Sequence, residues 1–113
     1  MVVNPEYDSY ESGNITSAFP TIDLVRCYRS DNMVEFSIRF SGTSVPYGTP
    51  LFTLSEGFRP RNGLFIVASG RLIDSNGVIY SNMLIYADTN GAIKQEVTSD
   101  AITSGWLQGI FIA

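Results

Sequence analysis

The sequence has no histidine, one cysteine and one lysine, and these absences exclude several kinds of chemistry. Without histidine, the usual base of acyl-transfer catalysis is missing, and Cys27 has no histidine to activate it as a nucleophile. A zinc site is excluded in practice for the same reason. One cysteine cannot form an intramolecular disulfide. We therefore expect Cys27 to be a small hydrophobic side chain in a strand.

Charges are few and the cations are dispersed. Charged residues make up 16% of the 113 residues, and the formal net charge is −4. We expect no nucleic-acid partner, because phosphate binding needs clustered cations. No apolar run approaches the length of about 20 residues that spans a bilayer. Residues 1–6 have neither the basic nor the apolar segment of a signal peptide, so neither membrane insertion nor secretion is expected.

The composition predicts a single folded domain. Hydrophobic residues make up 44% of the chain and aromatic residues 12%, which favours a packed core over disorder. Residues 1–14 carry three acids and two tyrosines without a period, and we predict an N-terminal arm or linker remnant there. Residues 15–113 are then one β domain. The low charge fits either a surface buried against other chains or one rich in serine, threonine and asparagine.

Alternating apolar residues predict a β-hairpin near the start of this domain. Residues 22–29 and 34–40 both have the period of two that is typical of half-buried strands, and residues 30–32 form a polar turn between them. Residues 64–68 are continuously apolar, which predicts a strand buried on both faces. The apolar run at 104–113 predicts a strand tucked into the sheet.

The remaining segments favour short strands and turns. Leu51–Gly63 is a turn-rich bridge in which Gly57 can take a positive φ and Phe58 is expected to pin the loop to the core. Residues 74–77 and 88–91 both have the sequence Asp-x-Asn-Gly, which favours a type I turn closed by a left-handed glycine over a calcium loop. Without any helical period, seven or eight short strands predict an all-β fold, an antiparallel β-sandwich or small β-barrel.

Catalysis finds little support in the sequence. A glycosidase needs two carboxylates that converge in space, and spacing alone does not exclude such a pair. Each candidate acid nevertheless fits a strand exterior or a turn. These acids are Glu35, Glu56, Asp74 and Asp88. We expect a protein that is not an enzyme and that needs neither a cofactor nor a metal.

Saccharide binding fits the residues better. Saccharide sites on β-scaffolds combine an aromatic platform with planar hydrogen-bonding side chains. Trp106 is the only tryptophan, although it also fits a core position or a seam between three subunits. Tyr80 and Tyr86 also fit ordinary strand packing. The candidate saccharide-binding residues are Trp106, Tyr80, Tyr86, Asp88 and Gln108.

The order of these features carries a family resemblance over about residues 15–113. The hairpin of residues 25–40 precedes Leu-x-Glu-Gly-Phe-Arg-Pro at 54–60, which is followed by apolar strands, Asn90-Gly91 and a Gly-Trp strand at 105–112. Together they resemble the head domain of receptor-binding or baseplate proteins from tailed phages of Gram-positive hosts, such as lactococcal phages. Residues 1–14 are too few for the long neck of that family, so we expect either a fragment of a longer protein or a trimer held by the head and arm alone.

The resemblance implies a function and partners. Members of that family are β-sandwich or β-barrel heads that form homotrimers at the phage tail tip, and they bind host cell-wall saccharides or phosphopolysaccharides. It therefore implies a virion protein of the tail tip or baseplate that contacts other tail proteins and attaches to host saccharide without cleaving it. The alternative is a purely structural baseplate, fibre or virion-decoration module that binds no sugar. No saccharide-contacting residue of that family can be matched to a position here.

Overall fold

A computed structural model describes residues 8–10, 15–81 and 83–113, and within these ranges the chain is built from strands without a helix. The ten strands are β1 (Asp8–Tyr10), β2 (Thr16–Ser17), β3 (Thr21–Ser30), β4 (Met33–Val45), β5 (Phe52–Thr53), β6 (Leu64–Asp74), β7 (Ile79–Tyr80), β8 (Met83–Ala87), β9 (Ala92–Gln95) and β10 (Ile102–Ile112). The all-β prediction is confirmed. The strands outnumber the predicted seven or eight because β1, β2, β5 and β7 have only two or three residues, too few to produce a period.

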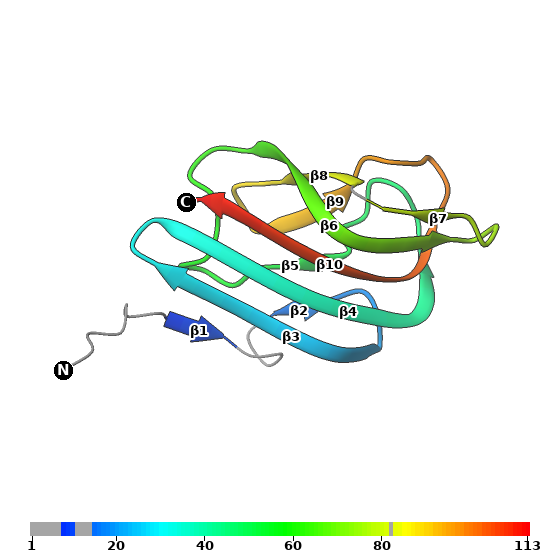
Figure 1. Cartoon of the computed structure of the whole chain (residues 1–113), viewed down its shortest axis with the longest axis horizontal. Helices are drawn as coiled ribbons and strands as arrows, with labels where there is room; N and C mark the ends of the chain where they lie inside the picture. Colours follow the sequence, from blue (N-terminus) through cyan, green and yellow to red (C-terminus); the bar gives the residue numbers. More distant parts are fainter. Residues whose placement is uncertain (1–7, 11–14, 82) are drawn as a thin grey trace.

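The strands form one antiparallel sheet that curls into a half-barrel (Figure 1). Their order is β1-β3-β4-β10-β6-β8-β9-β5-β2, and β7 pairs with β6 outside this path. The apolar run near the C-terminus is β10. It lies between β4 and β6, which confirms the prediction of a strand tucked into the sheet. The curl gives the sheet an inner face that encloses the core and an outer face.

Gly70 marks the place where the sheet curls. Residues 64–68 of β6 pair with β8, whereas residues 69–74 pair with β10. Gly70 has φ 124°, and a Cβ built on it would lie 1.9 Å from the carbonyl oxygen of Trp106. Only glycine combines this φ with such a close approach of two backbones. The change of partner strand on β6 therefore depends on a residue without a side chain.

Aromatic rings fill the space inside the curl. The ring centroids of Phe36 on β4 and Phe52 on β5 are 5.5 Å apart, and those of Phe19 and Phe40 are 4.4 Å apart. These distances lie in the range of favourable aromatic pairs. Phe58 is also buried, and Gly57 before it has φ 96°. The predicted pinning of the Leu51–Gly63 bridge to the core is confirmed.

The predicted hairpin is confirmed as β3 and β4. Its turn contains Asp31 at φ 58°, a conformation that a short polar residue tolerates. Cys27 is buried on β3. Burial raises the pKa of its thiol to about 12, which leaves it protonated and unreactive. The interpretation of Cys27 as a packing residue is therefore confirmed.

Both Asp-x-Asn-Gly segments form the predicted turn. The amide of Gly77 donates to the carbonyl oxygen of Asp74 at 3.0 Å, and that of Gly91 donates to Asp88 at 2.9 Å. The two glycines have φ 81° and 88°. The repeated sequence therefore encodes a repeated local structure.

The prediction that residues 64–68 are buried on both faces is wrong. Phe65 is 60% exposed and Val67 is 71% exposed. The sheet is a single curled layer, so β6 packs its inner face on the core while nothing among the described residues covers its outer face. Of the predicted N-terminal arm, β1 pairs with β3 of the same chain; residues 1–7 and 11–14 lie outside the described residues.

Candidate functional site

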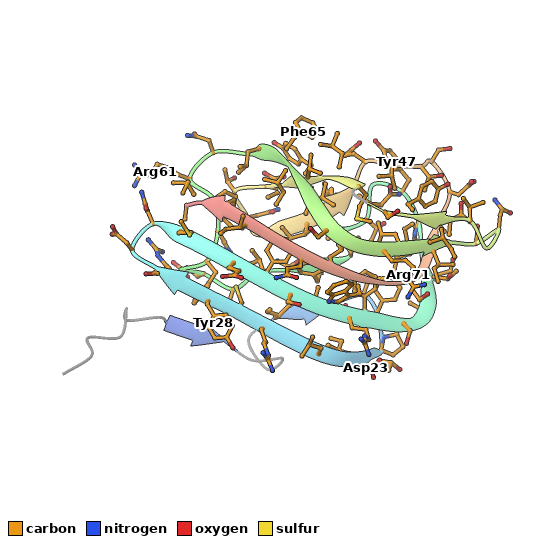
Figure 2. All side chains as sticks on the ribbon, in the orientation of Figure 1. Asp23, Tyr28, Tyr47, Arg61, Phe65 and Arg71 are labelled. Carbon is orange, nitrogen blue, oxygen red and sulfur yellow. The ribbon has the colours of Figure 1, made fainter. Side chains whose placement is uncertain are left out.

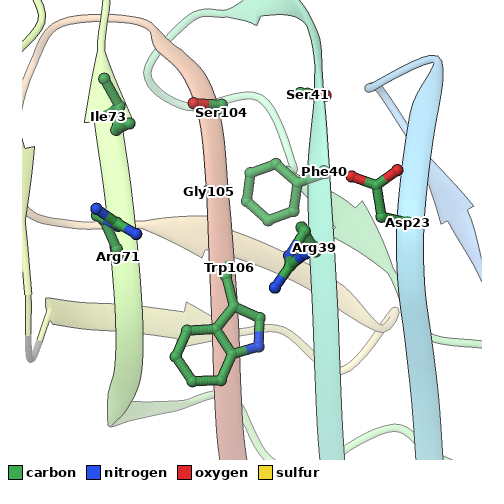
Figure 3. Close-up of a pocket in the computed structure, with 9 residues that line it drawn as sticks. All are labelled: Asp23, Arg39, Phe40, Ser41, Arg71, Ile73, Ser104, Gly105 and Trp106. Carbon is green, nitrogen blue, oxygen red and sulfur yellow. The ribbon is translucent and has the colours of Figure 1, made fainter.

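The candidate site lies on the outer face of β4, β10 and β6 (Figure 3). Alternation along β10 turns Leu107 and Phe111 into the core and Trp106 outward, where it is 37% exposed. The alternative interpretation of Trp106 as a core residue is therefore wrong. On the neighbouring strands, Arg39 of β4 and Arg71 of β6 lie directly opposite Trp106. The register thus places Trp106 between two arginines on one face of the sheet.

A shallow hollow of about 470 Å³ surrounds this row, and we refer to it as the Trp106 hollow. Its acid is Asp23, which the register shift of β3 between Ile22 and Leu24 adds as an extra residue. Ser41 of β4 and Ser104 near the start of β10 contribute hydroxyl groups. The hollow is lined by Asp23, Arg39, Phe40, Ser41, Arg71, Ile73, Ser104, Gly105 and Trp106.

A hydrogen bond holds the indole in place. The Nε1 atom of Trp106 donates to the Ser37 hydroxyl on β4 at 3.4 Å. The bond fixes the polar edge of the ring and leaves part of its surface open to solvent. An exposed aromatic surface in a fixed orientation is the platform on which the apolar face of a sugar ring packs.

The two arginines of the row are available for a ligand. Both are exposed, and neither guanidinium group forms a hydrogen bond or ion pair with any other described residue. A guanidinium group presents five N–H donors in a planar fork, which suits hydroxyl, carboxylate or phosphate oxygens. With Asp23 as the one acid among the lining residues, the hollow carries a local positive charge in a chain whose net charge is −4.

Gln108 joins Trp106 on the outer face near the hollow, whereas the other three candidate residues lie outside the Trp106 hollow. The Tyr80 hydroxyl donates to Asp74 Oδ2 at 2.9 Å, and Tyr80 packs against the core. Tyr86 on β8 packs against Phe65, with ring centroids 4.9 Å apart. The Asp88 carboxylate accepts the Thr89 amide in the turn after β8. The structure thus gives the tyrosines strand-packing contacts, as the alternative interpretation held.

Asp74, which Tyr80 contacts, is a buried carboxylate in the turn between β6 and β7. Burial raises its pKa, but hydrogen bonds from the Val78 amide, the Tyr80 hydroxyl and the Asn76 amide outweigh burial and leave the pKa below its ordinary value. Its role is therefore to hold the turn. Among the described residues, no cluster of three or more acids and cysteines lies close enough together to hold a metal ion.

Sequence reasoning missed most of the Trp106 hollow. Alternation along residues 34–40 does place Arg39 on the outer face, and that signal was available. No local signal pairs it with Trp106, because the pairing depends on the register between strands far apart in sequence. Arg71 and Ser104 were missed for the same reason, and Asp23 was missed because a bulge places it in the hollow.

The outer face changes character toward the other end of the same strands. There, exposed apolar side chains come from β6, β8 and β10, and Figure 2 shows Phe65 and Arg71 at opposite ends of β6. Val67 lies opposite Leu84 in the pairing of β6 with β8, and it adjoins Ile110 of β10 in a second hollow. We refer to these residues as the apolar end: Phe65, Val67, Leu84, Ile110 and Ile112.

Comparison with known proteins adds no assignment to this geometry. No protein-family model matches the chain, and a search of curated proteins gives no match. Nowhere in the described ranges is there a helix with the length and apolar character needed to cross a membrane. The candidate site therefore stands on its own residues: an aromatic platform between two arginines, with an acid and hydroxyl groups at its border.

Proposed function

We propose that this chain is the receptor-binding head domain of a phage tail or baseplate protein, which attaches the virion to host cell-wall saccharide without cleaving it. The observation that carries the proposal is the outward position of Trp106 between Arg39 and Arg71 over a hollow. The family resemblance described above supplies the biological setting. It also implies a homotrimer at the tail tip, in contact with other baseplate or tail proteins.

The composition of the Trp106 hollow supports a saccharide as the ligand. A sugar ring has an apolar face that packs on an indole, and its hydroxyl groups need fixed donors and acceptors at the border. Asp23, Ser41 and Ser104 supply acceptors and Arg39 and Arg71 supply donors around one ring. The hollow is shallow, which suits weak binding at each site. Three such sites in a trimer, multiplied over many trimers, would attach a virion through avidity.

The proposed saccharide binding is tested by removing the indole ring of Trp106. Trp106→Ala should weaken binding to a purified cell-wall polysaccharide by at least about tenfold, because a central aromatic contact contributes about 2 kcal/mol or more. The probes are polysaccharides from a panel of Gram-positive bacteria that includes lactococci, measured by calorimetry. Tyr47→Ala is the matched control, because Tyr47 is an exposed aromatic outside the hollow. Equal affinities of the Trp106 variant and the wild type would contradict the proposal.

The apolar end favours a second candidate function. An exposed apolar surface marks an interaction site more often than an isolated apolar residue does. The same fold used as a structural baseplate, fibre or decoration module would bury this surface against other virion proteins and bind no sugar. Incorporation of the Trp106→Ala protein into virions, together with no binding of the wild type to any polysaccharide in the panel, would favour this second function.

A further inference from the structure

We propose that a second subsite, centred on Gln108, adjoins the Trp106 hollow, so that the ligand is a chain of at least two sugar units. The inference rests on the proposed function and goes beyond it by specifying the length of ligand that the site takes. It is carried by the register of four neighbouring strands and by two further hollows that share Gln108.

A row of hydrogen-bonding side chains crosses the sheet beside the row that contains Trp106. Gln108 on β10 lies opposite Ser37 on β4 and opposite Ser69 on β6, and Ser37 in turn lies opposite Arg26 on β3. We refer to these four residues as the polar row. With strands about 4.8 Å apart, the row extends roughly 14 Å across the outer face. Hydroxyl, amide and guanidinium groups therefore follow one another over the width of more than one sugar ring.

Two hollows lie on either side of the Gln108 side chain. One, of about 160 Å³, opens toward β3 and is lined by Leu24, Arg26, Tyr28, Glu35, Phe36, Ser37 and Gln108. The other, of about 260 Å³, opens toward β6 and is lined by Glu35, Val67, Ser69, Gln108, Gly109 and Ile110. Gln108 and Glu35 border both hollows. The amide and the carboxylate can therefore contact a ligand group in either of them.

The distance between the two subsites suits consecutive units of a chain. Trp106 and Gln108 point to the same face and are two residues apart on one strand, a separation of about 7 Å. Ser37 connects the two rows, because it belongs to the polar row and accepts the hydrogen bond from the Trp106 indole. A sugar packed on the indole would have its neighbour in the chain within reach of Gln108.

The two subsites differ in the contacts that they offer. The Trp106 hollow supplies an exposed ring and two arginines, whereas the Gln108 subsite supplies an amide, hydroxyl groups and the opposite charges of Arg26 and Glu35. An amide both donates and accepts hydrogen bonds, as a sugar hydroxyl does. We assign ring stacking to the first subsite and hydroxyl recognition to the second.

The test is a series of monovalent fragments of increasing length, prepared by partial hydrolysis of the polysaccharide that the wild type binds. For the wild type, affinity should rise about tenfold or more from one unit to two or three, since a second set of contacts adds about 1.4 kcal/mol. Gln108→Ala should abolish this rise and leave the affinity for a single unit unchanged. Trp106→Ala should weaken binding of every fragment.

A matched control and two opposing results complete the experiment. Ile112→Ser changes the next outward residue of β10 that borders neither subsite, and it should keep the full dependence on length. Equal affinity of the wild type for one unit and for longer fragments would overturn the second subsite and leave the proposed function intact. Failure of every polysaccharide in the panel to bind would overturn both. Circular dichroism of each variant establishes that its fold is retained.

Discussion

The outer face of β10 has two ends that differ in chemistry, although both belong to one strand whose side chains alternate between the inner and the outer face. Trp106 and Gln108 lie among arginines, serines and acids, whereas Ile110 lies beside the exposed Val67, and Ile110 and Ile112 are themselves exposed. Alternation decides only that all four residues point outward. The difference between the ends comes from what the neighbouring strands place beside them, which is a property of register.

This difference suggests that the two ends have different partners. Fixed polar groups around a ring suit a small hydroxylated ligand, while an apolar surface with few charges suits a protein. We therefore assign the saccharide to the Trp106 end and contacts between subunits or with tail proteins to the apolar end. Phe65, Leu84 and Ile112 border none of the hollows around Trp106 and Gln108, so these positions of the apolar end can be altered without altering the proposed saccharide site.

The largest effect is expected at Gly70, where β6 leaves β8 and pairs with β10. Gly70→Ala combines an unfavourable φ with a clash against the Trp106 carbonyl group. It should lower the free energy of unfolding by about 3 kcal/mol or more and abolish saccharide binding. Chemical denaturation and calorimetry measure the two quantities.

Gly48→Ala is the matched control for this substitution. Gly48 also has a positive φ, 89°, but a Cβ there would meet nothing within 4 Å. The Gly48→Ala protein should therefore lose only about 1 kcal/mol of its free energy of unfolding, which is the cost of the left-handed conformation. It should still bind the saccharide. Equal losses for the two variants would show that the close approach of β6 and β10 contributes nothing.

The next largest effect concerns assembly through the apolar end. Val67→Lys places a charge on the most exposed apolar side chain of that surface. If the surface lies in the trimer seam, the charge should weaken self-association by about 3 kcal/mol, or roughly a hundredfold. Sedimentation should then detect a monomer where the wild type has a threefold mass. Binding of a single sugar unit should not change, because Val67 borders the Gln108 subsite and lies outside the Trp106 hollow.

Val78→Lys is the control, because Val78 is exposed and apolar but lies in the β6–β7 turn outside the apolar end. If the wild type stays monomeric at micromolar concentration, the apolar end is not the seam of a homotrimer. A trimer that Val67→Lys leaves intact would move the seam to another surface.

A smaller effect is expected at the turn between β6 and β7, which begins at Asp74. Asp74→Asn removes a carboxylate that accepts three hydrogen bonds, whereas Asp88→Asn alters the equivalent turn, where the carboxylate bonds only Thr89. Asp74→Asn should therefore destabilise the protein more. Because hydrogen bonds lower the Asp74 pKa, its contribution is complete above the ordinary pKa and is lost as the pH falls through the lowered one.

Urea unfolding over a range from neutral to strongly acidic pH measures this contribution. In the Asp74→Asn protein, stability should depend less on pH at the acid end than in the wild type. An unchanged acid dependence would mean that the three hydrogen bonds do not favour the charged carboxylate.

The smallest effects are expected where sequence reasoning placed binding residues outside the Trp106 hollow. Asp88→Ala and Tyr86→Phe should leave saccharide affinity within about twofold, because neither side chain borders the hollows around Trp106 and Gln108. Calorimetry with the polysaccharide that the wild type binds makes the comparison. A tenfold loss in either variant would place part of the site on β8 or in the turn after it, beyond the Trp106 hollow and the Gln108 subsite.

Local patterns predicted the parts of the fold that local interactions determine. The β3–β4 hairpin, the two Asp-x-Asn-Gly turns and the buried Phe58 follow from alternation, turn chemistry and aromatic size. The exposed outer face of β6 did not follow, because the continuous apolar run at 64–68 resembles a doubly buried strand. A sequence cannot indicate whether the second layer belongs to the same chain.

The candidate site was predictable only in part. Trp106 and Gln108 were chosen for their chemistry, as the only tryptophan and an amide near it in sequence, and the structure places both on the outer face. Arg39 and Arg71 require the register of β4, β10 and β6, which no short segment encodes. Tyr80 was included because it lies near a turn in the sequence. In the structure, its hydroxyl donates a hydrogen bond to Asp74.

The most direct test of the central claim uses the fact that Trp106 is the only tryptophan. Its fluorescence reports the proposed platform without any label, and a polysaccharide that binds the protein can be titrated against it. The proposal predicts a saturable change in the emission of Trp106 whose midpoint matches the affinity from calorimetry. Binding detected by calorimetry with no change in this emission would contradict the assignment of saccharide to the Trp106 hollow.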